Sequence, residues 1–170
     1  MLSPAERTRW GETPENQRAT FVAGRVLLRE LASDLLGISP ALVQIAAMCV
    51  DCGGSHGRPE LVGAPYFLSL SHTPEAVVAV ASDSRVGVDA EPNAGSAARV
   101  DAVEKLTGRA SIAHWTAVEA ILKADGRGLR VDPREVEVDG AVGSLHGARY
   151  RLLAPDIDPG LTVTVAQRLA

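Results

Sequence analysis

Residues 68–91, with the sequence LSLSHTPEAVVAVASDSRVGVDAE, consist of short apolar runs separated by turn residues. Turn signals at residues 73–74 and 83–84 divide this stretch, and each apolar run has the length of a short strand. With the flanking residues, the pattern predicts strands over 66–71, 76–81 and 86–90. Three short strands in succession favour an antiparallel meander, which we expect to pack on a long helix.

The last of these strands ends in two carboxylates, Asp89 and Glu91. Because side chains alternate along a strand, both acids project from one face and Ala90 from the other. Adjacent acids repel unless a cation lies between them, and carboxylate oxygens suit Mg²⁺, which often bridges to substrate phosphates. Ser71 and His72, at the first turn, add donors for a phosphate oxygen. The alternative is an edge strand with solvated acids.

A long helix is predicted over residues 14–36, before the strands. Thr13 is the expected cap, Pro14 the first helical residue and Gly37 the stop. Residues 1–13 are expected to be irregular. A strand is expected over 44–50.

Three arginines form a basic stripe along this helix. Arg18, Arg25 and Arg29 are spaced seven and four residues apart, so they share one face. Arginine favours bidentate contact with phosphate or carboxylate, but a charged stripe is commonly a solvated face. The sequence leaves both interpretations open.

A glycine-rich loop, CVDCGGSHGRP, spans residues 49–59. Cys49, Cys52 and His56 resemble part of a zinc site, but structural zinc takes four ligands and the chain has no second cysteine pair. A thiol–disulfide role is a further alternative. The favoured interpretation is a loop that presents Arg58, because glycine lets the backbone approach a ligand closely.

The second half of the chain repeats the order of helix, then strands. A breaker at residues 92–96 suggests lobes at 1–92 and 93–170 that act as a single functional unit. Helices are expected over 97–106 and 112–125, followed by strands over 135–138, 149–153 and 161–166. The predicted fold class is α+β, with two similar lobes in a pseudo-twofold arrangement, each a small antiparallel sheet packed on a long helix.

The helix expected over 112–125 carries a polar row on one face. Trp115, Glu119 and Lys123 are four residues apart and therefore align along the helix. The alternative for Glu119 and Lys123 is an ordinary surface ion pair, which contributes about 0.3–0.5 kcal/mol.

Composition excludes some classes of protein. A net charge of −4 argues against a general nucleic-acid-binding surface. No apolar run is long enough to span a membrane, and the N-terminus lacks an apolar signal core. We therefore expect a cytoplasmic protein with reduced cysteines.

Together these motifs resemble the 4′-phosphopantetheinyl transferase superfamily, of the Sfp type. That family carries Ser-His, then Gly-Val-Asp-x-Glu, then Trp-x3-Glu-Ala-x2-Lys-Ala-x-Gly-x-Gly-Leu. This chain has Ser71-His72, GVDAE at 87–91 and WTAVEAILKADGRGL at 115–129. Residues 57–59 resemble the family's Gly-Lys-Pro or Gly-Arg-Pro. The resemblance runs from about Arg18 to the C-terminus.

The resemblance implies transfer of the phosphopantetheine arm of coenzyme A to a serine of an apo acyl or peptidyl carrier protein, with release of 3′,5′-ADP. The implied enzyme is a monomer of two lobes. Asp89, Glu91 and Glu119 resemble the ligands of Mg²⁺, for which Mn²⁺ could substitute. Glu119 resembles the group that accepts the serine proton, and Lys123 the group that holds the pyrophosphate.

The resemblance also implies contacts to coenzyme A from both halves of the chain. These would come from Arg25, Arg58, Ser71, His72, Asp89 and Lys123, with Arg25, Arg58 and His72 at the 3′-phosphate. The link from Glu91 to Trp115 is shorter than in the family, Val118 replaces a basic residue, and Leu68-Ser69 replaces Phe-Asn. Two alternatives remain: a member that binds coenzyme A or a carrier protein without catalysis, and an unrelated Mg²⁺-dependent nucleotide hydrolase.

Overall fold

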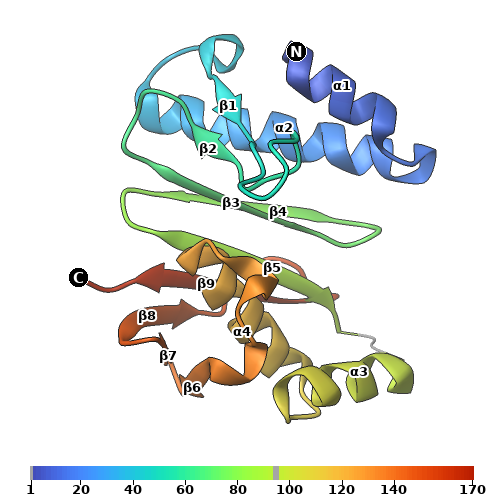
Figure 1. Ribbon diagram of the computed structural model, residues 1–170, viewed down its shortest axis with the longest axis vertical. Coiled ribbons are helices and arrows are strands. Elements are labelled where there is room, and N and C mark those ends of the chain that lie inside the picture. The colour runs from blue at the N-terminus through green and yellow to red at the C-terminus, as the bar shows by residue number, and fades with distance from the viewer. Residues whose placement is uncertain (1, 94–95) are drawn as a thin grey trace. The chain divides into compact units, whose positions relative to one another are not determined.

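The computed structural model describes residues 2–93 and 96–170 (Figure 1). Within these residues the chain forms four α-helices and two antiparallel sheets, so the predicted α+β class is confirmed. The chain divides into two compact units, Met1–Asp83 and Ser84–Ala170, each with its own apolar core. In the described part of the chain, no helix has both the length and the apolar character needed to cross a lipid bilayer.

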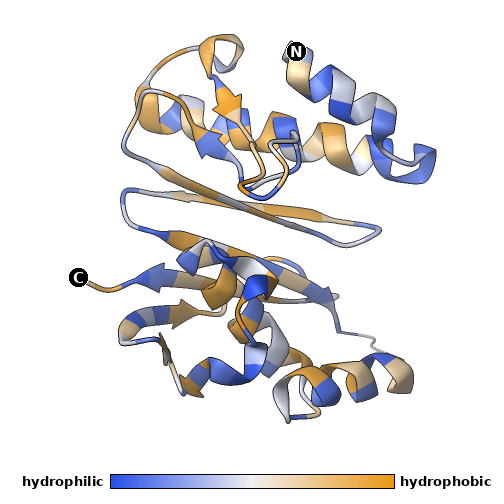
Figure 2. Ribbon diagram, in the orientation of Figure 1, coloured by the Kyte–Doolittle hydropathy of each residue, from blue (hydrophilic) through white to orange (hydrophobic). Residues whose placement is uncertain are grey.

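The first unit is built on helix α2 (Glu15–Leu36), which packs against a four-stranded sheet. The sheet has the order β1 (Ile45–Ala46), β2 (Glu60–Leu61), β3 (Phe67–His72), β4 (Val77–Ser82), and all pairs are antiparallel. Figure 2 shows apolar residues along β3 and β4. The core residues are Leu28, Ala32, Val43, Ile45, Leu61 and Leu68. Helix α2 ends at Gly37, whose φ of 64° suits glycine, as predicted.

The expectation of an irregular N-terminus is wrong, because residues Pro4–Glu12 form helix α1. Ser3 caps α1, the Glu6 side chain accepts a hydrogen bond from the Ser3 backbone, and Pro4 occupies the first turn. This is a capping box, a signal present in the sequence. Thr13 belongs to the C-terminal cap of α1, and Pro14 rather than Thr13 precedes α2.

Three of the strands, β1, β2 and β7, differ from prediction, and the two-residue strand β2 is not predicted at all. Strand β1 covers only part of the expected 44–50, because the chain turns into the cysteine loop. Strand β7 lies between two turns and has no marked apolar run. It is joined to β8 by His146 and Gly147, whose φ angles of 49° and 80° suit the tight turns that connect adjacent antiparallel strands.

The second unit packs helix α4 (Ile112–Asp125) on a five-stranded sheet. The sheet has the order β5 (Val86–Pro92), β9 (Leu161–Arg168), β8 (Ala148–Leu153), β7 (Val142–Leu145), β6 (Glu137–Asp139). The second unit also contains helix α3 (Ala97–Thr107) and the short helical turns η2 (Gly128–Arg130) and η3 (Pro133–Glu135). The first unit contains one such turn among the described residues, η1 (Pro40–Leu42). Ile121, Leu122, Leu145 and Tyr150 are among its fully buried core residues.

The predicted meander is wrong in its third strand. Strand β5 does not join β3 and β4, but pairs with β9 over its whole length, with Asp89 opposite Thr164. Apolar periodicity identifies a strand but not its partner, and this partner lies at the far end of the chain. The two units therefore divide before β5, whereas the sequence suggested residues 92–96; of these, Ala94 and Gly95 lie outside the described residues.

Candidate functional site

One face of β5 lies directly against helix α4. Gly87, Asp89 and Glu91 share this face, because side chains alternate along the strand. A Cβ atom on Gly87 would collide with the Ala120 carbonyl oxygen and lie 2.5 Å from the Ala124 nitrogen. Glycine at position 87 thus permits the close approach of strand and helix that brings the two acids to α4.

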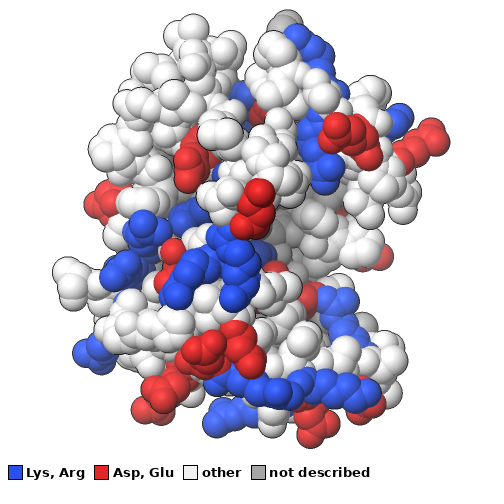
Figure 3. Space-filling view, in the orientation of Figure 1, with Lys and Arg blue, Asp and Glu red and all other residues white. Residues whose placement is uncertain are grey.

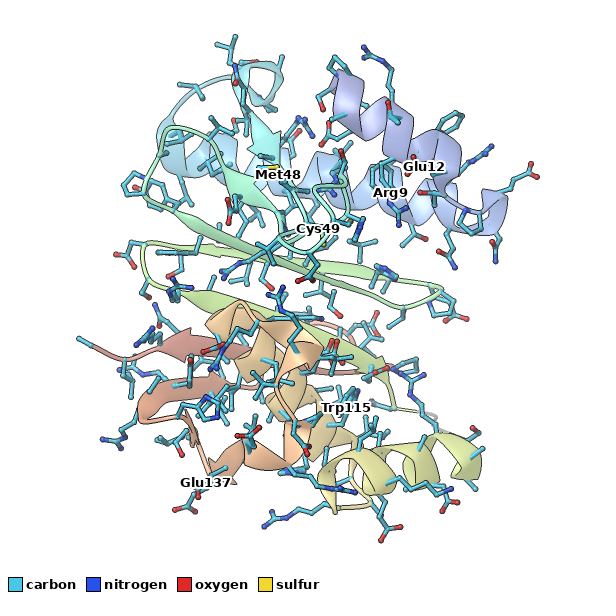
Figure 4. The ribbon with its side chains drawn as sticks, viewed as in Figure 1. Arg9, Glu12, Met48, Cys49, Trp115 and Glu137 are labelled. Carbon is cyan, nitrogen blue, oxygen red and sulfur yellow. The ribbon has the colours of Figure 1, made fainter. Side chains whose placement is uncertain are left out.

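The polar row of α4 faces these acids. Trp115 Nε1 donates to Glu91 Oε1 at 3.1 Å, and Lys123 Nζ donates to Asp89 Oδ1 at 2.7 Å. Lys123 Nζ also lies 3.4 Å from Glu119 Oε1. Trp115, near the start of α4, is labelled in Figure 4. Since Trp115 meets Glu91 and Lys123 meets Asp89, helix and strand run in opposite directions.

The three acids converge on a small volume. One oxygen each of Asp89, Glu91 and Glu119 lies within 4.8 Å of the others. Strand β5 is an edge strand of its sheet, as the alternative held, but its acids are not solvated, because Asp89 is only 2% exposed and Glu91 8%. Arg99, from α3, forms an ion pair with Glu91 Oε2. Three carboxylates at this separation could hold one divalent cation through oxygen ligands.

The surroundings of Glu119 shift its pKa upward from the ordinary value. Burial raises the pKa of Glu119 and the charge of Asp89 raises it further, whereas Lys123 acts in the opposite direction. The Glu119 and Lys123 side chains are 24% and 25% exposed, and Lys123 bonds a buried aspartate as well. The interpretation of these two residues as an ordinary surface ion pair is therefore wrong. A bound cation would relieve the mutual repulsion of the acids.

Two arginines of the basic stripe are buried in the first unit. Arg29 makes two hydrogen bonds to the Glu6 carboxylate, at 3.0 and 2.7 Å, and Arg25 Nε lies 3.7 Å from Glu6 Oε1. Arg18, the third arginine of the stripe, is partly exposed, and its guanidinium lies 4.6 Å from the ring centroid of Trp10. The solvated-face interpretation is thus wrong for Arg25 and Arg29.

The remaining predicted site residues also lie in the first unit. Arg58 lies near the end of the glycine-rich loop, and its guanidinium lies 5.8 Å from the ring centroid of Phe67. Ser71 and His72 end β3, with Ser71 buried and His72 exposed. Asp89, Glu91, Glu119 and Lys123 all belong to the second unit, where the structure brings them together.

Two charged residues that contact predicted site residues are not predicted from the sequence. Glu6 neutralises the arginines of α2, and its capping-box signal was available in the sequence. Arg99 neutralises Glu91, but its place on α3 carries no comparable local signal.

On the face of the molecule in Figure 3, basic and acidic side chains are interspersed.

A scan against protein-family models found no match to this chain, and a search of curated protein sequences found no significant match.

Proposed function

We propose that this chain transfers the 4′-phosphopantetheine arm of coenzyme A to a serine of an apo carrier protein, in a Mg²⁺-dependent reaction that releases 3′,5′-ADP. The observation that carries the proposal is the convergence of Asp89, Glu91 and Glu119 beside Lys123. These four residues stand at the motif positions of the Sfp-type phosphopantetheinyl transferases. The proposal includes a cytoplasmic monomer whose two units are similar lobes in a pseudo-twofold arrangement.

The donor set fits a hard divalent cation. All three candidate ligands are carboxylates, and each carboxylate has enough lone pairs to bind a cation while accepting a hydrogen bond. Glu91 could thus keep its bond from Trp115 and its pair with Arg99. When bound there, Mg²⁺ would neutralise the pyrophosphate of coenzyme A and the charge that develops on the leaving phosphate. Mn²⁺ is the natural substitute, because it also prefers oxygen ligands.

Glu119 is suited to be the general base. A serine hydroxyl is a weak nucleophile and needs a proton acceptor as it attacks. The raised pKa of Glu119 makes it a stronger base than an ordinary glutamate once it is ionised. The serine oxygen forms a bond to the phosphorus of the phosphopantetheine arm, the bond from that phosphorus to 3′,5′-ADP breaks, and the serine proton passes to Glu119.

Lys123 is suited to stabilise the leaving group. Its ammonium is held between Asp89 and Glu119, so it is fixed in place before substrate binds. A fixed cation stabilises negative charge that develops on the departing phosphate without reorganisation. In the same proposal, Arg25, Arg58 and His72 contact the 3′-phosphate, and Ser71 donates a hydrogen bond nearby.

Intact-mass analysis of carrier proteins tests this function. Apo carriers of fatty-acid, polyketide and peptide synthesis would be incubated with the chain, coenzyme A and Mg²⁺. We expect a carrier to gain the mass of one phosphopantetheine arm, and 3′,5′-ADP to appear in equal amount. The gain should be lost without metal and with Glu119→Gln, but kept with Glu104→Gln, which changes an exposed glutamate of α3.

The other outcomes separate the alternatives. Coenzyme A that binds without modifying any carrier would indicate a binding protein and overturn the proposal. Cleavage of coenzyme A in the absence of a carrier would indicate a hydrolase that activates water.

A further inference from the structure

A second cluster of ligand atoms lies in the first unit, in the loop between β1 and β2. The sulfurs of Cys49 and Cys52 and a ring nitrogen of His56 lie within 4.8 Å of one another. Cys52 Sγ is 3.0 Å from His56 Nε2. Figure 4 labels Cys49 on this loop. The three residues are close in sequence, but only the fold of the loop turns all three side chains toward one point.

The loop has a defined backbone that holds this arrangement. Cys49 N donates to Gly54 O at 2.8 Å, and Gly53 N donates to Cys49 O at 2.9 Å. Gly53 has a φ of 72°, which favours glycine. A Cβ on Gly57 would lie 2.7 Å from Cys49 N, so the end of the loop must be glycine to close on its beginning.

A backbone N–H group also points at one of the sulfurs. Gly54 N donates to Cys52 Sγ at 3.4 Å. Donors directed at sulfur stabilise a thiolate, which is the form that binds metals.

We propose that Cys49, Cys52 and His56 bind one zinc-class cation through two thiolates and an imidazole nitrogen. Zinc binds thiolate at about 2.3 Å and imidazole at about 2.0–2.1 Å, so its tetrahedral ligands lie about 3.5–3.8 Å apart. The three ligand atoms, within 4.8 Å of one another, already lie near that spacing. Cys52 and His56 are exposed, so water can reach the fourth position.

This site differs from the acid cluster in its chemistry and its place in the chain. Thiolate and imidazole select soft or borderline cations such as zinc, whereas three carboxylates suit Mg²⁺. The two clusters belong to different units. The inference therefore does not rest on the proposed function, and either can fail alone. Its direct competitor is a Cys49–Cys52 disulfide.

Cobalt substitution tests the site with the full, tag-free chain under reducing conditions. Co²⁺ bound by two thiolates gives a thiolate-to-cobalt charge-transfer band and the visible bands of tetrahedral cobalt. We expect both bands to saturate at one equivalent and to vanish when Zn²⁺ is added. Cys52→Ser and His56→Asn should each lose intensity in these bands. Ser55→Ala, in the same loop, and His146→Asn, at an exposed histidine of the second unit, should keep the full spectrum.

Native mass spectrometry and thiol alkylation of the wild-type chain test the site without relying on the folding of any variant. The wild-type chain should carry one zinc, and zinc should slow the alkylation of both cysteines. A wild-type spectrum without the thiolate band, or one abolished by Glu119→Gln, would overturn the proposal. So would a Cys49–Cys52 disulfide that forms at the same rate with and without zinc.

Discussion

At the scale of single residues, the proposed reaction needs Glu119 to be ionised, and that ionisation destabilises the folded chain. Burial, followed by the charge of Asp89, raises its pKa, so the folded chain holds this proton more tightly than the unfolded chain. As pH rises past about 4.3, the ordinary value for glutamate, ionisation favours the unfolded chain and stability falls. The full loss is reached above the raised pKa of the folded state.

We therefore expect Glu119→Gln to stabilise the protein at neutral pH while it abolishes transfer. Glutamine keeps the shape of the side chain but has no carboxylate to ionise, so the gain over wild type should shrink as the pH falls from the raised pKa of the folded state toward about 4.3, and it should be absent below that value. Thermal unfolding at several pH values, without metal, measures this gain. Glu104→Gln is the control and should leave the profile unchanged, whereas a less stable Glu119→Gln at pH 7 would contradict the argument.

At the scale of elements, the acid site depends on the close contact of β5 and α4. Gly87 is the point of closest approach, and a methyl group there meets helix backbone, which cannot move aside as a side chain can. We expect Gly87→Ala to destabilise the protein by about 1–3 kcal/mol, the usual cost of overpacking, and to weaken Mn²⁺ binding because α4 shifts away from the acids. Denaturant unfolding and a Mn²⁺ titration measure the two effects.

Gly11→Ala is the matched control for that prediction. Gly11 lies in α1, and a Cβ there would meet nothing within 4 Å. Alanine should stabilise that helix by about 0.5–1 kcal/mol and leave Mn²⁺ binding unchanged. A Gly87→Ala variant that is as stable as wild type would show that strand and helix can separate without cost.

Helix α1 is held to α2 through Glu6, so this short helix depends on one buried carboxylate. Burial opposes ionisation of Glu6, but hydrogen bonds from Arg29 and Ser3 outweigh it and lower the pKa. A lowered pKa contributes stability above about pH 4.3 that is lost as the pH falls through the folded value. Glu6→Gln leaves Arg25 and Arg29 buried without a counter-charge, and we expect it to cost about 3–5 kcal/mol at pH 7.

The acid limb of the stability profile checks this prediction. Wild type should lose stability on acidification more steeply than Glu6→Gln, because the variant no longer has that carboxylate. Glu12→Gln removes one member of an exposed ion pair with Arg9, and its effect should stay below about 1 kcal/mol. Equal effects of the two substitutions would mean that the arginines of α2 do not need Glu6.

The sequence predicts a feature of these elements where a pattern of neighbouring residues specifies it, but not where the feature depends on contacts between distant segments. The spacing of Trp115, Glu119 and Lys123 defines one face of α4, and the alternation of Asp89 and Glu91 defines one face of β5. Their convergence was expected only from the family resemblance, because no local pattern states which strand lies under which helix. The pairing of β5 with β9 and the ion pair from Arg99 depend on contacts that no local signal in the sequence indicates.

At the scale of the whole molecule, the proposed function predicts coenzyme A contacts from residues of each unit. The expected contacts to the 3′-phosphate, Arg25, Arg58 and His72, belong to the first unit, and the expected pyrophosphate contacts, Asp89 and Lys123, to the second. Each unit has its own core, so a ligand that bound only one unit would leave the other unprotected.

We therefore expect coenzyme A with Mg²⁺ to slow backbone hydrogen exchange in both units, at β3 and residues 53–59 and at β5 and α4. Adenosine 3′,5′-diphosphate without metal should protect mainly the first unit, because it keeps only one of the two phosphates of the pyrophosphate. Lys123→Ala should remove the protection of β5 and α4 more than that of β3, and Arg58→Ala should do the reverse. Lys105→Ala, at an exposed lysine of α3, is the control for lost positive charge. Protection confined to one unit under saturating coenzyme A and Mg²⁺ would refute the proposed contacts of the other unit, even if coenzyme A binds tightly.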